Sequence, residues 1–208
     1  MRQLLFCLLS IARFCASLFI QCTRPGVSKY ILLLSGQYCL AAQPAATTQP
    51  FSDALTSAIR TGDAAQFQAV CKDWHASGAF SPGELNWNYN ALMSLEPNAV
   101  LLVQNDDDAR PLWVIQQVLN IRKEVSVLSL SILNDPAARD FFSKGKNIAF
   151  KGASQNELIR NLLANSAKTP VYLGVMLEKS IIQQEQNNLY LTGLAMKFSA
   201  TPFDNLAT

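Results

Sequence analysis

One stretch of the chain, residues 98–134, constrains the fold more than any other. It contains two short apolar runs, residues 99–103 and 125–130, on either side of a segment with helical periodicity, residues 110–122. This pattern predicts a strand–helix–strand unit. A crossover of this kind makes its two strands parallel neighbours. The sequence therefore predicts an α/β fold with residues 104–108 at the carboxyl end of the first strand, where open parallel sheets bind their ligands.

Further apolar runs extend this unit. Residues 171–175 predict a buried strand, and residues 189–198 predict a last strand that Gly193 interrupts as a β-bulge would. Helix-capping signals predict three helices within residues 51–96. We therefore expect a three-layer, Rossmann-like α/β domain at residues 97–208, with a mostly parallel sheet of four or five strands and a three-helix N-terminal arm.

The first 42 residues have the composition of a leader. They hold four basic residues and no acidic residue, and an apolar stretch leads to the small residues Cys39 and Ala41. A positive residue, an apolar stretch and small residues in this order predict a signal peptide. We therefore expect export to the periplasm or the exterior, with residues 43–50 as a flexible tether.

Two apolar runs, residues 4–20 and 30–34, follow one another in this leader. One hypothesis is that translation starts near Val27, which would leave residues 1–26 outside the natural protein. The alternative is an N-terminal membrane anchor across residues 4–20. Because Arg13 would lie near the centre of such a span, we favour export with cleavage.

Charge and rare side chains argue against several classes of protein. Of the 17 Lys and Arg residues, four precede residue 43, whereas all 15 Asp and Glu residues follow it, so the body carries 13 positive against 15 negative charges. Without a basic excess, no nucleic-acid partner is expected. After residue 42 the chain has one cysteine, Cys71, and one histidine, His75. This disfavours an internal disulfide, a zinc site and a catalytic triad.

The consecutive acids Asp106, Asp107 and Asp108 have two interpretations. Hard cations prefer carboxylate oxygens, so Asp106 and Asp108 could bind Mg²⁺ or Ca²⁺. Such a site would favour a divalent-metal-dependent enzyme, similar to a phosphatase or a glycosyltransferase. Alternatively, Asp108 caps the following helix and the other two acids stabilise its positive end. The sequence favours capping, because charged loop clusters often have no further role.

A larger motif carries a family resemblance. Asn105 to Asp108, followed by Pro111-Leu112-Trp113 and later by Leu189 to Ala195, resembles the soluble C-terminal portion of a family of polytopic bacterial membrane proteins. That family is grouped with protein O-mannosyltransferases, and the similarity covers about residues 84–200. Asn105 stands where the family pattern has glycine, and Asp107 where it has asparagine.

The resemblance implies a detached soluble module, because those transferases are thought to work through a multi-span membrane region. Our first expectation is an exported, non-catalytic module of the cell envelope that binds a glycan, a glycoprotein or a membrane-embedded partner. The metal-dependent enzyme and a purely structural domain are the alternatives. No cofactor is expected in the first case, and Mg²⁺ or Ca²⁺ in the second. The expected ligand contacts are Asp106, Asp107, Asp108, Arg110 and Trp113.

Overall fold

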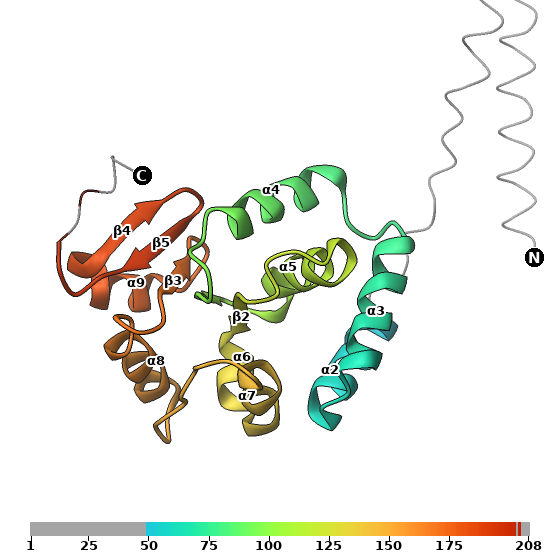
Figure 1. The fold of residues 1–208 in the computed structure, drawn as a ribbon, viewed down its shortest axis with the longest axis horizontal. Helices are drawn as coiled ribbons and strands as arrows, with labels where there is room; N and C mark the ends of the chain where they lie inside the picture. The colour runs from blue at the N-terminus through green and yellow to red at the C-terminus, as the bar shows by residue number, and fades with distance from the viewer. Residues whose placement is uncertain (1–48, 203, 205–208) are drawn as a thin grey trace, which may run out of the picture. The chain divides into compact units, whose positions relative to one another are not determined.

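The computed structural model describes residues 49–202 and residue 204 (Figure 1). The expected signal peptide, the hypothetical start near residue 27 and most of the expected tether lie outside these residues. The first described helix, α2, begins at Gln49, so the last two residues of the expected tether are helical. In the part of the chain that the structure describes, no helix is both long and apolar enough to cross a bilayer.

From residue 49 onward, three helices precede the first strand, as the sequence predicts: α2 (Gln49–Thr61), α3 (Ala64–Ala76) and α4 (Pro82–Met93). Asp63 caps α3 by accepting from the backbone N–H of Gln66. Ser81 and Glu84 form the expected capping box at the start of α4. Cys71 is buried in the core, and burial raises the pKa of its thiol to about 12, so it is not a reactive thiol.

The predicted strand–helix–strand unit is confirmed. It consists of β1 (Val100–Val103), α5 (Asp106–Leu119) and β2 (Ser126–Ser129). The two strands are parallel, with Val100 opposite Ser126 and Val103 opposite Ser129. Both strands are buried along their whole length, which explains their continuous apolar or small composition.

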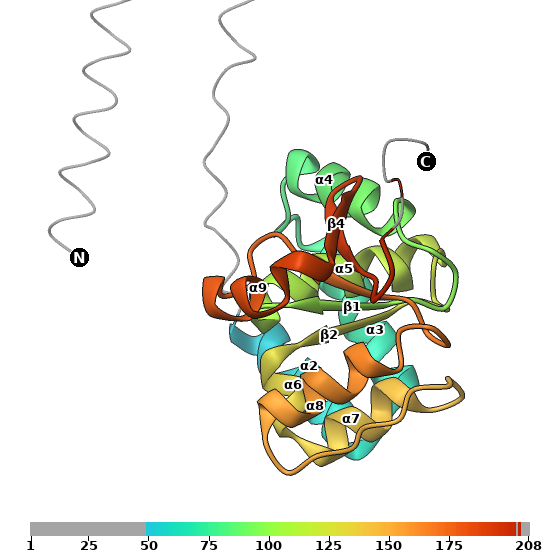
Figure 2. The same ribbon diagram turned by 90° about the vertical axis from the view of Figure 1, so that its left-hand side faces the viewer.

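The remaining elements complete a five-stranded sheet. They are α6 (Leu130–Asn134), α7 (Pro136–Ser143), α8 (Gln155–Ala164), β3 (Val171–Gly174), α9 (Lys179–Glu185), the 3₁₀ helix η1 (Gln186–Asn188), β4 (Leu189–Thr192) and β5 (Ala195–Phe198). The strand order is β2-β1-β3-β5-β4. In Figure 2, α4 and α5 lie above β1 and β2, whereas α6, α7 and α8 lie below them.

The expectation of a mostly parallel sheet is wrong. Strands β2, β1 and β3 are parallel, but β5 is antiparallel to both β3 and β4. The reason is Gly193, which forms a two-residue hairpin turn with Leu194 instead of a bulge within one strand. Its φ of +61° fits the first position of the turns that match the twist of a hairpin. The fold is therefore α/β with a mixed five-stranded sheet.

Candidate functional site

The topology of the sheet creates a crevice between β1 and β3. From β1 the chain crosses through α5 to β2 on one side, whereas β3 lies on the other side of β1. The chain therefore leaves β1 and β3 in different directions at their carboxyl ends. Open α/β sheets bind ligands at this kind of switch point.

A pocket of about 140 Å³ occupies this crevice. Its floor includes the ends of the two strands, Val103 and Gly174. Its walls come from α4, from the first turns of α5 and from the loop after β3, and the side chains used below are Glu84, Trp87, Gln104, Asp107, Asp108 and Met176. Drug-sized ligands occupy pockets of about 300–1,000 Å³, so this pocket has room for one small chemical group only.

The walls combine exposed apolar side chains with acids. Trp87 is 45% exposed and Met176 is 71% exposed, although both are large hydrophobic side chains. Asp107, Asp108 and Glu84 supply carboxylates, and no Lys, Arg or His among the described residues lines the pocket. The crevice therefore combines exposed apolar side chains with negative charge.

The first turn of α5 positions the aspartates. The side chain of Asn105 accepts from the backbone N–H of Asp108 at 3.0 Å, so Asn105 caps the helix rather than Asp108. The three acids then lie in the first turn, where the helix dipole favours negative charge. Gln104 accepts from the backbone N–H of Glu178 at 2.7 Å, which ties the loop after β3 to the loop after β1.

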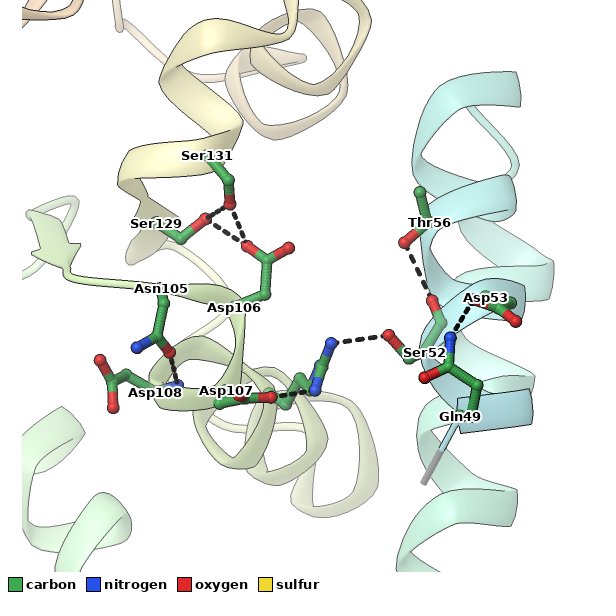
Figure 3. A network of polar contacts seen from close by, with 11 residues as sticks. Gln49, Ser52, Asp53, Thr56, Asn105, Asp106, Asp107, Asp108, Ser129 and Ser131 are labelled. Atoms are coloured by element: carbon green, nitrogen blue, oxygen red, sulfur yellow. Dashed lines mark hydrogen bonds and ion pairs between the residues drawn. The ribbon is translucent and has the colours of Figure 1, made fainter. Parts of the chain in front are cut away.

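The three carboxylates point in different directions (Figure 3). Asp106 accepts from the hydroxyls of Ser129 and Ser131, whose oxygens are 2.7 Å apart. Asp107 forms an ion pair with Arg110. Asp108 points away from Asp106 and, among the described residues, has no ion-pair partner.

Asp106 therefore belongs to a second, neighbouring hollow and not to the crevice. This hollow also has a volume of about 140 Å³ and is lined by Arg60, Trp113, Ser131 and Asp135. Arg60 and Asp135 form an ion pair of 3.2 Å across it. Within the described residues, no three His, Cys, Asp or Glu side chains are grouped as metal ligands. Asp106 and Asp108, the expected metal ligands, do not converge on a common point in Figure 3.

Arg110 and Trp113 are the other two expected ligand contacts, and they lie behind the first turn of α5. Arg110 donates to Ser52 on α2 at 2.6 Å, and its guanidinium carbon lies 5.4 Å from the centre of the Trp74 ring. It joins α5 to the N-terminal helices. Trp113 is only 2% exposed, and its indole N–H donates to the backbone carbonyl of Val127 at 3.1 Å. Trp113 does not line the crevice; it lines the second hollow and a further pocket at the outer edge of β2.

The sequence did not predict Trp87 or Met176 as site residues, and it placed Gln104 at the carboxyl end of the first strand without naming it as a ligand contact. The position of Trp87 in α4 gives no local signal of a ligand contact. Met176 is the second residue after β3, so a local signal exists for it: a long apolar residue just beyond the carboxyl end of a buried strand. Gln104 is the first residue after β1.

Together the fold and the crevice define a mixed α/β domain with one small acidic and aromatic pocket at its switch point. Residues 85–137 match the family model described as TMEM260-associated domain 2. The match covers α4 from Leu85 onward, β1, α5, β2 and α6, which include most of the crevice. It is consistent with the resemblance to O-mannosyltransferase-like membrane proteins. Comparisons with curated proteins and with solved structures give no match.

Proposed function

We propose that this chain is a non-catalytic binding module of the cell envelope whose crevice holds one sugar residue of a glycan or glycoprotein. The observation that carries the proposal is the half-exposed ring of Trp87 in a small pocket that also contains Asp107 and Asp108. A sugar ring presents C–H groups that pack on aromatic faces. Its hydroxyls donate to carboxylate and amide oxygens, which Asp108 and Gln104 supply.

The arrangement of the walls supports binding. Within the described chain, no Ser, Thr, Cys, Lys or His side chain lines the crevice, so its candidate nucleophiles are the carboxylates of Glu84, Asp107 and Asp108. Asp107 already forms an ion pair with Arg110, which orients it as part of the wall. The module would therefore recognise a glycan and leave chemistry to another protein or another region.

The context of the family supports a place in the envelope. The matched model bears the name of a membrane protein, and the leader at residues 1–42 has the composition of an export signal. We propose that the module is exported and acts beside a membrane-embedded partner, as a periplasmic, secreted or N-terminally anchored protein.

Titration calorimetry of the full chain with the methyl glycosides of mannose, glucose, galactose and N-acetylglucosamine tests the proposal. We expect a saturable signal with at least one of them that Trp87→Ala abolishes. Tyr89→Ala is the matched control, because Tyr89 is also an exposed aromatic residue of α4 but does not line the crevice. Loss of binding in both variants, or no binding by the wild type, would contradict the proposal.

Titration calorimetry also tests the two alternatives, a metal-dependent enzyme and a purely structural domain. A heat of binding with Mg²⁺, Ca²⁺ or Mn²⁺ that Asp106→Ala or Asp108→Ala removes would favour the metal-dependent enzyme. No heat with any sugar or cation would leave a structural domain whose acids stabilise the start of α5.

A further inference from the structure

The outer edge of β2 carries a feature that the crevice does not explain. Since β2 is the last strand of the sheet, its outward backbone carbonyls have no neighbouring strand. Side chains bond them instead: Trp113 donates to Val127, and Gln116 and Lys146 donate to Val125 at 3.0 and 3.1 Å. The edge is therefore covered by side chains, and a pocket of about 140 Å³ lies among them.

Three lysines line this pocket, which we call the lysine pocket: Lys123, Lys144 and Lys146. They come from two separate segments, the loop before β2 and the turn after α7. No acidic residue of the described chain lines the pocket. This contrasts with the body as a whole, which carries 13 positive and 15 negative charges after residue 42.

The lysines are not neutralised by nearby acids. Glu124, which follows Lys123 in the chain, is paired with Arg122 at 2.7 Å. Lys123 and Lys144 are exposed and have no ion-pair partner among the described residues. Lys146 is half-buried. Burial lowers the pKa of its ammonium, and the charge of Glu124 only partly opposes this. An anion in the pocket would be attracted by the charge of these ammonium groups.

The remaining walls are aromatic. Phe67, Phe141 and Phe142 line the pocket beside the lysines, with the Phe141 and Phe142 ring centres 5.1 Å apart. An anionic group attached to an apolar or ring-shaped body would therefore find both a charged and an apolar surface.

We propose that the lysine pocket binds a phosphate-type oxyanion. Three ammonium groups from two segments provide several N–H donors for the oxygens of one such anion. The phosphate could belong to a lipid headgroup at the membrane surface or to a free, soluble phosphate compound. The proposal is independent of sugar binding in the crevice, since none of the three lysines lines that pocket.

Nuclear magnetic resonance of the full, ¹⁵N-labelled chain tests the proposal. Inorganic phosphate is titrated into the protein, and it replaces chloride so that the ionic strength stays constant. We expect saturable shifts of the amides around Lys123 and Lys146. The double variant Lys123→Gln/Lys144→Gln should weaken the apparent affinity by about tenfold or more, because it removes two of three charges. The matched control Lys72→Gln/Lys179→Gln removes two exposed lysines outside the pocket and should leave the affinity within about twofold.

A second experiment distinguishes a lipid headgroup from a soluble phosphate compound. Vesicles of phosphatidylglycerol, with phosphatidylcholine vesicles as reference, are sedimented with the protein. Binding to the anionic vesicles that depends on Lys123 and Lys144 assigns the pocket to lipid headgroups. Saturable binding of inorganic phosphate without vesicle binding assigns it to a soluble phosphate. If both experiments are negative, or if the control variant loses as much binding as the test variant, the proposal is overturned and the lysines only protect the strand edge.

Discussion

The indole N–H of Trp113 donates to the backbone carbonyl of Val127, 3.1 Å away, so a side chain of α5 takes the place of a neighbouring strand at the outer edge of β2. Phe142 stacks on the same indole with ring centres 5.2 Å apart, and Phe67 meets it edge-on. This aromatic cluster joins α3, α5 and α7 around the unpaired side of the sheet. Trp113 thereby has a defined role in stability.

Replacing Trp113 with Phe tests this role. The variant keeps an aromatic ring but leaves the Val127 carbonyl without its donor, so we expect a loss of about 1–3 kcal/mol in the free energy of unfolding. Chemical denaturation measures this loss. Trp87→Phe is the control, because Trp87 is 45% exposed and its replacement should change stability by less than about 0.5 kcal/mol. Weaker sugar binding by Trp113→Phe at unchanged stability would instead support Trp113 as a ligand contact.

Gly193 should not tolerate a side chain. Its φ is +61°, and a Cβ atom there would lie 2.5 Å from the Cβ of Ser94 at the end of α4. Gly193→Ala should therefore destabilise the protein by about 1–3 kcal/mol in thermal or chemical denaturation. In contrast, a Cβ at Gly83, in the first turn of α4, meets no atom within 4 Å. Gly83→Ala should be neutral or stabilising by about 0.4–1 kcal/mol, and equal destabilisation by both variants would contradict the hairpin geometry.

The stability of the protein should fall at high pH because of Tyr172. Burial, reinforced by the negative charge of Glu96, raises the pKa of this phenol from 10.0 to about 12. Between these values the unfolded chain releases the proton while the folded protein keeps it. The free energy of unfolding therefore decreases as the pH rises from 10 towards 12, by at most about 1.4 kcal/mol per pH unit from this group.

Denaturation curves at pH 8, 10 and 11 compare the wild type with Tyr172→Phe, which should show a smaller decrease with pH. Tyr89→Phe, at an exposed position of α4, is the control and should follow the wild type. A wild-type decrease that survives in Tyr172→Phe would assign the effect to other groups.

Asp106 and Ser131 should be energetically coupled. The carboxylate accepts from both Ser129 and Ser131 and so ties the start of α5 to the end of β2 and to α6. A double-mutant cycle with Asp106→Ala and Ser131→Ala should give a coupling energy of about 0.5–3 kcal/mol. Sugar binding in the crevice should be retained in both variants. Additive effects of the two substitutions would mean that the hydrogen bond does not contribute to stability.

Part of the candidate site could be predicted from the sequence. Residues 104–108 lie at the carboxyl end of β1, and Asp107 and Asp108 reach the crevice, because a buried run followed by acids and a helix specifies that local order. The N-cap of α5 was predicted at Asp108, one turn later than Asn105, which is the N-cap in the structure. Asn105 and Asp108 are both good N-cap residues, and their local pattern does not distinguish a helix that begins at Asp106 from one that begins after Asp108.

The sequence by itself determined the local elements: the parallel pair β1 and β2, the helix between them, and the capping boxes that begin at Ser81 and Ser154. These follow from periodicity and from hydrogen bonds over a few residues. Only the tertiary structure decided that β3 lies beside β1, that a hairpin adds two antiparallel strands, and that Trp87 on α4 shares a pocket with Asp107 and Asp108. Those relationships depend on which buried surfaces meet after the whole chain has packed, and residues far apart in the chain leave no local pattern that records them.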